Sequence, residues 1–414
     1  MKILKLLAAT LLVSPIMASE PGAFVDQNRW ELIWEDQFDY PDSELDSDWE
    51  VQNSPSHHIL CSRWRENAVV KDGMLRLENR KEQRGGQEWT SASMWTKKQY
   101  KYGYFECRYR YAAATGTNNS FWLMTRDYEP TVGEKFEIDI NEGHYPNEVN
   151  TNLHRWRSEV VDGVKKNVSM PNSKSFLYGV RPDVKFEFEN PIKATKLRLS
   201  FNDPSNNNIN EFRAYGMSDN GYPDALSESA DTDVKGLVNY VCEEGVRVTP
   251  YGVTSDDAEN SVSCVADGSL ATKWSSNGEG TKGFEVEFSE LKTLGCIQFC
   301  NGWQDKGGSW RGMASDYQVE YYDGEEWHPV GSMDVSESYD FAEEFHTYGL
   351  EWTEDELIYY FDGEEIRRID NEFCYSQAPV FLSLALVKWD GPITDAVDGT
   401  FMEVDYVRVY KERE

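Results

Sequence analysis

Apolar and polar residues alternate along short segments throughout this chain, and the apolar residues do not recur with the period of a helix. Four examples of such short predicted strands are Met74–Glu78, Lys196–Phe201, Tyr317–Tyr322 and Leu357–Phe361. Glycine, asparagine, aspartate and proline separate such segments, as expected of turns between strands. Because a sheet must bury one face against another layer, the pattern predicts an all-β architecture of packed sheets.

One alternating segment, Glu137–Glu142 (Glu-Ile-Asp-Ile-Asn-Glu), carries three acids. Residues i and i+2 of a strand share a face, so the side chains of Glu137 and Asp139 point the same way. Glu142 is three positions beyond Asp139, and a regular strand would turn it to the opposite face. A β-bulge near Ile140–Asn141 would add one residue and return Glu142 to the face of the other two acids.

Three carboxylates on one strand face repel one another, which raises the pKa of at least one of them. Folding alone does not require such an arrangement. Hydrolysis of a glycosidic bond with retention does require it, because one carboxylate acts as nucleophile and one protonated carboxyl as acid, about 5–5.5 Å apart. The segment therefore predicts a retaining glycosidase, and a solvated acidic strand face is the alternative.

The acidic segment resembles the bulged catalytic motif of glycoside hydrolase family 16, which includes laminarinases, lichenases, agarases, porphyranases and carrageenases. Other segments resemble further strands of that family in the same order. These are Trp89–Trp95 and Tyr102–Arg108 (a strand pair ahead of the active site), Asn119–Met124 (a substrate-lining strand), and Phe345–Trp352 and Met402–Tyr410 (closing strands). The resemblance covers residues 28–174 and 338–412 and implies a concanavalin-like β-jelly-roll sandwich with a cleft across its concave face.

The same resemblance implies roles for individual residues. Glu137 matches the family's nucleophile, Glu142 its acid/base, and Asp139 the residue that assists between them. Trp122, Trp95 and Trp389 fall where the family lines its cleft, with Trp389 expected near a late strand. Aromatic faces of this kind stack on the C–H surfaces of sugars.

Two further residues are candidates for substrate binding. His154 matches a histidine that follows the catalytic strand by one hairpin, and a structural histidine is the alternative. Arg65 lies in a segment that resembles a cleft loop and could meet a sulfate or a hydroxyl, whereas a surface salt bridge is the alternative.

About 160 residues separate the two hydrolase-like parts, far more than a loop needs. Val265–Ser276 and Asp316–Val330 resemble the opening and middle of a discoidin (F5/8 type C) domain. Three segments that resemble its closing strands come earlier in the sequence, namely Tyr178–Asp183, Ala194–Leu199 and Asn210–Tyr215. We therefore expect an inserted, circularly permuted discoidin-like β-sandwich at 176–335, with residues 217–245 joining the original ends.

The insert divides a catalytic domain that we expect at residues 20–175 and 336–414. Insertion of this kind is tolerated at exposed loops. Within the insert, Trp303 and Trp310 flank a glycine-rich tip that either contacts a carbohydrate ligand or is only structural.

Net charge and cysteine content restrict the partners and cofactors. A formal net charge of −32 without a basic stripe argues against nucleic-acid binding. There are seven cysteines, of which Cys107 lies in a predicted core strand, while Cys242–Cys264 and Cys296–Cys300 are candidate disulfides. No zinc-ligand spacing occurs. We expect no required cofactor, no metal in the active site, and a monomer; a structural calcium cannot be recognised from the sequence.

Residues 1–19 have the features of a secretory signal peptide. Lys2 and Lys5 precede an apolar run at Leu6–Ile16, which is too short to span a bilayer. No other segment could span a membrane, and we expect a secreted or periplasmic protein.

These features predict a secreted, retaining, endo-acting β-glycoside hydrolase of polysaccharides. Asn119–Leu123 lacks the Trp-Pro of many laminarinases, which favours an agar- or carrageenan-type galactan as substrate. Glu142–Val149 and Trp389–Gly391 resemble laminarinase segments, so an endo-β-1,3-glucanase is the alternative. A non-catalytic lectin is an alternative of another class, although a lectin has no need for closely spaced acids.

Overall fold

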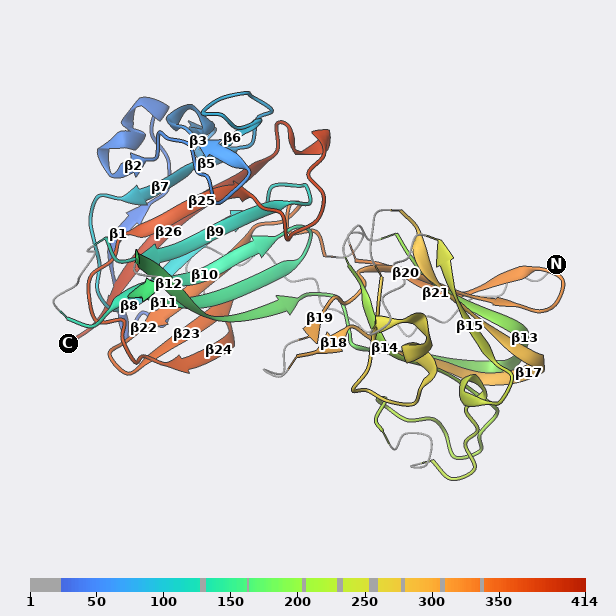
Figure 1. The fold of residues 1–414 in the computed structure, drawn as a ribbon. Helices are drawn as coiled ribbons and strands as arrows, with labels where there is room; N and C mark the ends of the chain where they lie inside the picture. The colour runs from blue at the N-terminus through green and yellow to red at the C-terminus, as the bar shows by residue number, and fades with distance from the viewer. Residues whose placement is uncertain are drawn as a thin grey trace.

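The computed structural model describes residues 24–126, 132–161, 164–202, 206–228, 234–252, 260–276, 280–305, 310–335 and 339–414. Two β bodies lie side by side in Figure 1. The expected signal peptide at 1–19 lies outside the described residues. Within them, no helix has the length and apolar character needed to cross a membrane.

The first body is a sandwich of two antiparallel sheets. Its eight-stranded sheet consists of β1 (Trp30–Asp36), β4 (Ala68–Lys71), β5 (Met74–Glu78), β8 (Gly103–Arg110), β22 (His346–Trp352), β23 (Glu356–Phe361), β24 (Glu364–Asp370) and β26 (Phe401–Glu412). Its seven-stranded sheet has the order β12-β11-β10-β9-β25-β7-β2. These strands are β2 (Trp49–Val51), β7 (Ser93–Thr96), β9 (Thr117–Met124), β10 (Lys135–His144), β11 (Glu148–Val161), β12 (Val164–Leu177) and β25 (Val380–Leu386).

The core of the sandwich draws on both hydrolase-like parts of the sequence. Phe105, Phe121 and Ile138 come from the first part, while Leu382 and Val404 come from the second, and all five are fully buried in one cluster. The expected all-β sandwich fold is therefore confirmed. Because the apolar face of each sheet covers the other, the opposite face of the seven-stranded sheet is free to carry polar groups.

One expected pairing is wrong. Trp89–Trp95 and Tyr102–Arg108 do not form a strand pair: β7 lies in the seven-stranded sheet and β8 in the eight-stranded sheet. The chain crosses between the layers at Tyr102 and Gly103, which both have positive φ. Gly103 is required there because a Cβ atom would lie 2.2 Å from the carbonyl oxygen of Tyr410.

The second body is built on one seven-stranded sheet with its own core. The strands are β13 (Asp183–Phe201), β14 (Asn208–Tyr215), β15 (Arg247–Gly252), β16 (Trp274–Ser275), β17 (Lys282–Asn301), β20 (Asp316–Tyr322) and β21 (Trp327–Asp334). Lys196–Phe201 pairs directly with Tyr317–Tyr322, and Leu199 lies opposite Val319. These two segments share one buried core. The discoidin-like ancestry, the permutation and the boundaries 176–335 stay predictions.

Short elements complete the two bodies. They are the parallel pair β3 (Cys61–Arg63) and β6 (Trp89–Ser91), the hairpin β18 (Trp303–Gln304) and β19 (Trp310–Arg311), and the 3-10 helices η1 (Asp42–Ser47), η2 (Arg65–Asn67), η3 (Tyr240–Cys242), η5 (Val262–Ala266) and η7 (Asp395–Val397).

Both connections between the bodies are bonded to the turn that joins β10 to β11. The backbone nitrogen of Tyr178 donates to the carbonyl of Asn147, and that of Phe341 donates 2.8 Å to the carbonyl of Pro146. Gly179 packs so closely on Tyr339 that a Cβ atom would lie 2.3 Å from its ring. The joint is therefore packed and hydrogen-bonded, and it lies near the strand that carries the acids.

No disulfide joins any of the seven cysteines, all of which the structure describes, so the two candidate disulfides do not form. Cys296 and Cys300 lie four residues apart in β17, a span of about 13 Å in a strand. A disulfide needs Cα atoms within about 7 Å. Cys107 is fully buried in the core, as expected of a small apolar residue.

Candidate active site

The three acids lie on β10, near the middle of the seven-stranded sheet. β10 pairs Asp139 with Trp122 but Asn141 with Phe121, so one extra residue stands at Ile140. This is the bulge that the acid spacing predicts. Asn141 is fully buried and donates to the hydroxyl oxygens of Tyr109 (2.7 Å) and Tyr111 (2.9 Å), which fixes the bulge from the core side.

Each acid of the segment has a different environment. The side chain of Glu137 is 18% exposed, and its Oε2 accepts a 3.1 Å hydrogen bond from the indole nitrogen of Trp156. Oε1 of Glu142 accepts a 2.9 Å hydrogen bond from Nδ2 of Asn118. Asp139 lies between them, is only 3% exposed, and its Oδ2 has no hydrogen-bond partner among the described residues.

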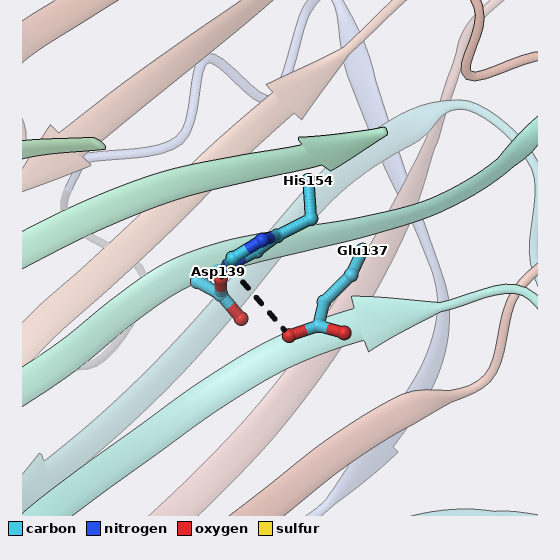
Figure 2. Close-up of side chains that lie close together, drawn as sticks. All are labelled: Glu137, Asp139 and His154. Carbon is cyan, nitrogen blue, oxygen red and sulfur yellow. Dashed lines mark ion pairs between the residues drawn. The ribbon is translucent and has the colours of Figure 1, made fainter. Parts of the chain in front are cut away.

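His154 lies directly opposite Glu137 on β11. Its Nε2 is 3.4 Å from Oδ2 of Asp139 and 4.0 Å from Oε1 of Glu137 (Figure 2). Asn152 accepts the backbone N–H of Leu153, so its Nδ2 donates 2.8 Å to the same imidazole nitrogen. Nε2 is therefore an acceptor, and the contact with Asp139 becomes favourable when Asp139 carries a proton.

Burial controls the protonation of the acids. Burial, with a further contribution from the charge of Glu142, raises the pKa of Asp139 well above its usual range. Burial and the charge of Asp139 also raise the pKa of Glu137 to about 8, although His154 and Trp156 oppose the shift. Asp139 is the more deeply buried of the two and faces an acceptor. We therefore assign the proton to Asp139 and the negative charge to Glu137.

A row of aromatic side chains continues from the acids across the same face. Asp139 lies opposite Trp122, Trp122 opposite Phe381, and Phe381 opposite Trp95. The rings of Trp122 and Phe381 stack at 4.1 Å, and those of Phe381 and Trp95 lie 5.6 Å apart. Phe381 was not predicted, because Val380–Leu386 is apolar at nearly every position and gives no sign of which side chains face outward.

Sequence comparison identifies the family. The profile of the glycosyl hydrolases family 16 matches residues 57–177 and 310–408, more than half of the chain. The chain belongs to glycosyl hydrolase family 16. This establishes the family named from the acidic motif.

Two similar proteins are named as a glucanase and a glycanase. A β-glucanase of Rhodothermus marinus is 36% identical over 143 residues, which is 30% of this chain and 49% of the relative. The endo-1,3-1,4-β-glycanase EglC of Rhizobium meliloti is 40% identical over 68 residues, which is 16% of this chain and 15% of the relative. The chain thus spans about half the length, or less, of these relatives.

Among solved structures, the laminarinase catalytic domain from Thermotoga maritima aligns with a TM-score of 0.45 at 17% identity, over 93% of this chain and 99% of that one. This score is too low to support a functional argument.

Two candidate residues of this family 16 chain lie away from the acids. The Arg65 guanidinium bonds Asp46 at 3.0 Å, Asp42 at 3.3 Å and the carbonyl of Ala68, which matches the salt-bridge alternative. Trp389 follows β25 in a loop instead of lying on a strand, and it is 68% exposed. The resemblance put Trp389 near a family tryptophan position on a late strand, whereas β25 ends three residues earlier, at Leu386.

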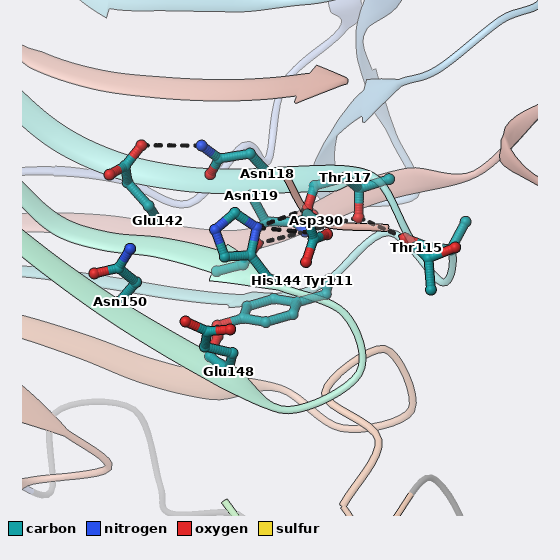
Figure 3. A network of polar contacts seen from close by, with 12 residues as sticks. Tyr111, Thr115, Thr117, Asn118, Asn119, Glu142, His144, Glu148, Asn150 and Asp390 are labelled. Atoms are coloured by element: carbon teal, nitrogen blue, oxygen red, sulfur yellow. Dashed lines mark hydrogen bonds and ion pairs between the residues drawn. The ribbon is translucent and has the colours of Figure 1, made fainter. Parts of the chain in front are cut away.

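A buried ion pair lies next to Glu142 (Figure 3). Nδ1 of His144 is 3.5 Å from Oδ2 of Asp390. Burial lowers the pKa of His144, but Asp390, Glu148 and Glu142 outweigh it and raise the pKa to about 10. His144 lies opposite Asn118, the residue that donates to Glu142. The sequence did not assign His144 a role, since it matches no motif of family 16.

The acids and His154 could also approach a cation. Glu137, Asp139 and His154 each offer one ligand atom, and these atoms lie within 4.8 Å of one another. Two carboxylates and an imidazole suit several divalent ions. A proton on Asp139 also removes the repulsion between the two carboxylates, without a bound cation.

Proposed function

We propose that this chain is a retaining endo-β-glycoside hydrolase that cleaves a β-glucan. The observation that carries the proposal is the bulged β10, which holds Glu137, Asp139 and Glu142 on one sheet face with a row of aromatic rings beside them. Both features suit a polysaccharide: carboxyl groups for the chemistry and flat apolar surfaces for sugar rings.

Each carboxyl has a defined part in the proposed reaction. Glu142 gives a proton to the leaving glycosidic oxygen while a carboxylate oxygen of Glu137 attacks the anomeric carbon, so the C–O bond breaks as a glycosyl ester forms. Glu142 then takes a proton from water, and the water oxygen displaces Glu137 from the anomeric carbon. Asp139 stays protonated between them and limits the negative charge at the site.

A β-glucan is preferred to the galactan that the missing Trp-Pro favoured. The two similar proteins described above are named as a β-glucanase and an endo-1,3-1,4-β-glycanase, and neither is named for a galactan. The aromatic row lies on three neighbouring strands, β9, β25 and β7, beside the acids on β10. A row of this width suits several consecutive sugar residues of a polysaccharide. Export, action as a monomer and independence of cofactors belong to the same proposal.

The test is release of reducing ends by the full chain from laminarin, lichenan, agarose, porphyran and carrageenans. We expect laminarin or lichenan to be cleaved to oligosaccharides of mixed length early in the reaction. Cleavage of galactans alone would overturn the β-glucan assignment. Binding without release from any of the five would instead support the lectin alternative.

A further inference from the structure

A cavity of about 1090 Å³ lies where the two β bodies meet. The hydrolase sandwich contributes the β10–β11 turn, the end of β12 and the loop after β25 to its lining, and the second body contributes Trp310–Met313. This volume is at the upper end of the roughly 300–1,000 Å³ typical of ligand sites. The cavity is therefore large enough for more than one sugar residue.

The cavity begins next to the acids. Glu148 and Asp390 line it, and both are tied to His144: Glu148 is its partner on β11, and Asp390 forms its ion pair. His144 is two residues beyond Glu142, about 7 Å along the strand. A polysaccharide bound at Glu142 therefore needs to extend only a short distance to reach the cavity.

Two tryptophans face this cavity from different bodies. Trp389 lies in a loop that is hydrogen-bonded to the hydrolase sandwich. The backbone nitrogen of Gly116 donates a 2.7 Å hydrogen bond to the carbonyl of Asp390, and the hydroxyl of Thr115 donates a 3.0 Å hydrogen bond to the carbonyl of Pro392. The indole of Trp389 is 68% exposed and lines the same cavity as Trp310. A ligand in the cavity would therefore cover apolar surface from both bodies.

The second tryptophan, Trp310, also lies in a segment that is fixed by backbone hydrogen bonds. Trp310 begins β19, and the next residues dock on β14, where the backbone nitrogen of Asn208 donates 2.7 Å to the carbonyl of Gly312. Gly312 has φ +60°, and a Cβ atom there would lie 2.0 Å from Nδ2 of Asn208. Trp303, on the partner strand β18, does not line the cavity.

We propose that this cavity is a second carbohydrate site, in which Trp389 and Trp310 hold a stretch of the substrate polysaccharide beyond the residues bound at Glu137 and Glu142. Lys174, Lys388 and Arg311 supply hydrogen-bond donors for sugar hydroxyls around the two rings. The inference rests on the proposed function for the identity of the sugar. It makes the inserted body part of the substrate site instead of a separately tethered binding module.

The test uses full-length Trp389→Ala and Trp310→Ala, with Trp303→Ala on the same hairpin as the matched control. We expect the first two to lower kcat/KM on laminarin about 10-fold through KM, the size of one lost aromatic contact, and to leave cleavage of a short aryl β-glucoside unchanged. Trp303→Ala should behave as the unchanged protein on both. If Trp310→Ala folds poorly, the result for Trp389→Ala decides the question. Trp389 is largely exposed, so its replacement should not disturb the fold.

Affinity gel electrophoresis of the same variants in laminarin and in lichenan provides a readout that does not depend on turnover. Retardation should weaken for Trp389→Ala and Trp310→Ala but not for Trp303→Ala. Equal loss on the long and short substrates, or no difference among the variants in either assay, would overturn the proposal. Retardation without turnover of any glucan would refute the proposed function while leaving the cavity as a sugar site.

Discussion

The indole nitrogen of Trp156 donates a 3.1 Å hydrogen bond to Oε2 of Glu137. A hydrogen bond to a carboxylate favours its charged form. Asp139, in contrast, faces the acceptor nitrogen of His154 and is more deeply buried. Of these two acids, Glu137 therefore carries the negative charge that a nucleophile needs, and Asp139 carries a proton and is neutral.

Glu137→Gln and Glu142→Gln should each abolish most hydrolysis without unfolding the protein. Loss of a general acid costs about 10²–10⁴-fold in rate, and loss of the nucleophile should cost at least as much. Reducing-end assays give kcat, and circular dichroism checks the fold. The matched control is Glu134→Gln, since Glu134 precedes the same strand but pairs with Arg155 and Arg157. Near-normal turnover of either acid variant in excess substrate would refute the mechanism.

Cleavage should proceed with retention of anomeric configuration. Glu137 and Glu142 lie on one face of β10. We therefore expect the reaction to pass through a glycosyl ester on Glu137 and to invert the anomeric carbon twice. Proton NMR of the first product, recorded before mutarotation, identifies the anomer. An inverted first product would mean that water attacks directly and that Glu137 acts as a base.

Stability should change with pH in opposite directions for Glu137→Gln and Glu134→Gln. Burial and the charge of Asp139 raise the pKa of Glu137 to about 8, and a proton on Asp139 removes the second of these contributions. The stability associated with the neutral form of Glu137 is therefore present at low pH and is lost as the pH rises from about 4.5, with about 8 as the upper limit. Glu137→Gln should therefore match the unchanged protein near pH 4 and exceed it near pH 8, at about 1.4 kcal/mol per unit of pKa shift.

The pKa of Glu134 is shifted in the opposite direction, so its contribution to stability changes with pH in the opposite direction. Hydrogen bonds from Arg155 lower its pKa to about 2, so its contribution is present above pH 4.5 and is lost on acidification. Glu134→Gln should lower stability slightly near pH 8 and have no effect near pH 2. Urea unfolding midpoints at several pH values measure both variants. A Glu137→Gln midpoint that does not rise relative to the unchanged protein between pH 4 and 8 would show that Glu137 is not desolvated.

Removing the aromatic row should weaken substrate binding more than the chemical step. Trp122→Ala should raise KM for laminarin about 3- to 10-fold, the value of one aromatic contact, with a smaller change in kcat. Phe381→Ala should have a smaller effect on KM, because Phe381 is only 3% exposed and acts by supporting the ring of Trp122. The double variant should lose less than the sum because the two rings stack. Trp64→Ala is the control, since Trp64 packs under Arg84 and bonds Ser62. A fall in kcat with unchanged KM would contradict sugar stacking.

The two bodies should unfold as separate units. Ile138 is buried in the core of the hydrolase sandwich and Leu199 in that of the second body, and no residue belongs to both clusters. Ile138→Ala and Leu199→Ala should each cost about 2–5 kcal/mol but should lower different transitions in calorimetry. If both variants shift one common transition, the division at about 176–335 does not describe an independent domain.

Local patterns in the sequence determined the strand that carries the acids. Alternation with a period of two, together with three acids at Glu137, Asp139 and Glu142, specifies a bulged strand face, because side-chain direction in a strand depends only on neighbouring residues. The four short strands predicted between turn residues are also strands in the structure, because turn residues and strand-forming residues act locally. The direct pairing of Lys196–Phe201 with Tyr317–Tyr322 was also expected, from resemblance instead of periodicity.

Tertiary structure alone decided which distant residues meet the acids. Phe381 joins the aromatic row because β25 lies beside β9, a pairing between segments more than 250 residues apart that depends on how the sheets pack. Packing also separates β7 from β8, and it brings Trp389 and Trp310 to one cavity. The protonation of Glu137 and Asp139 was likewise undecided by the sequence, since burial and neighbouring groups set their pKa values.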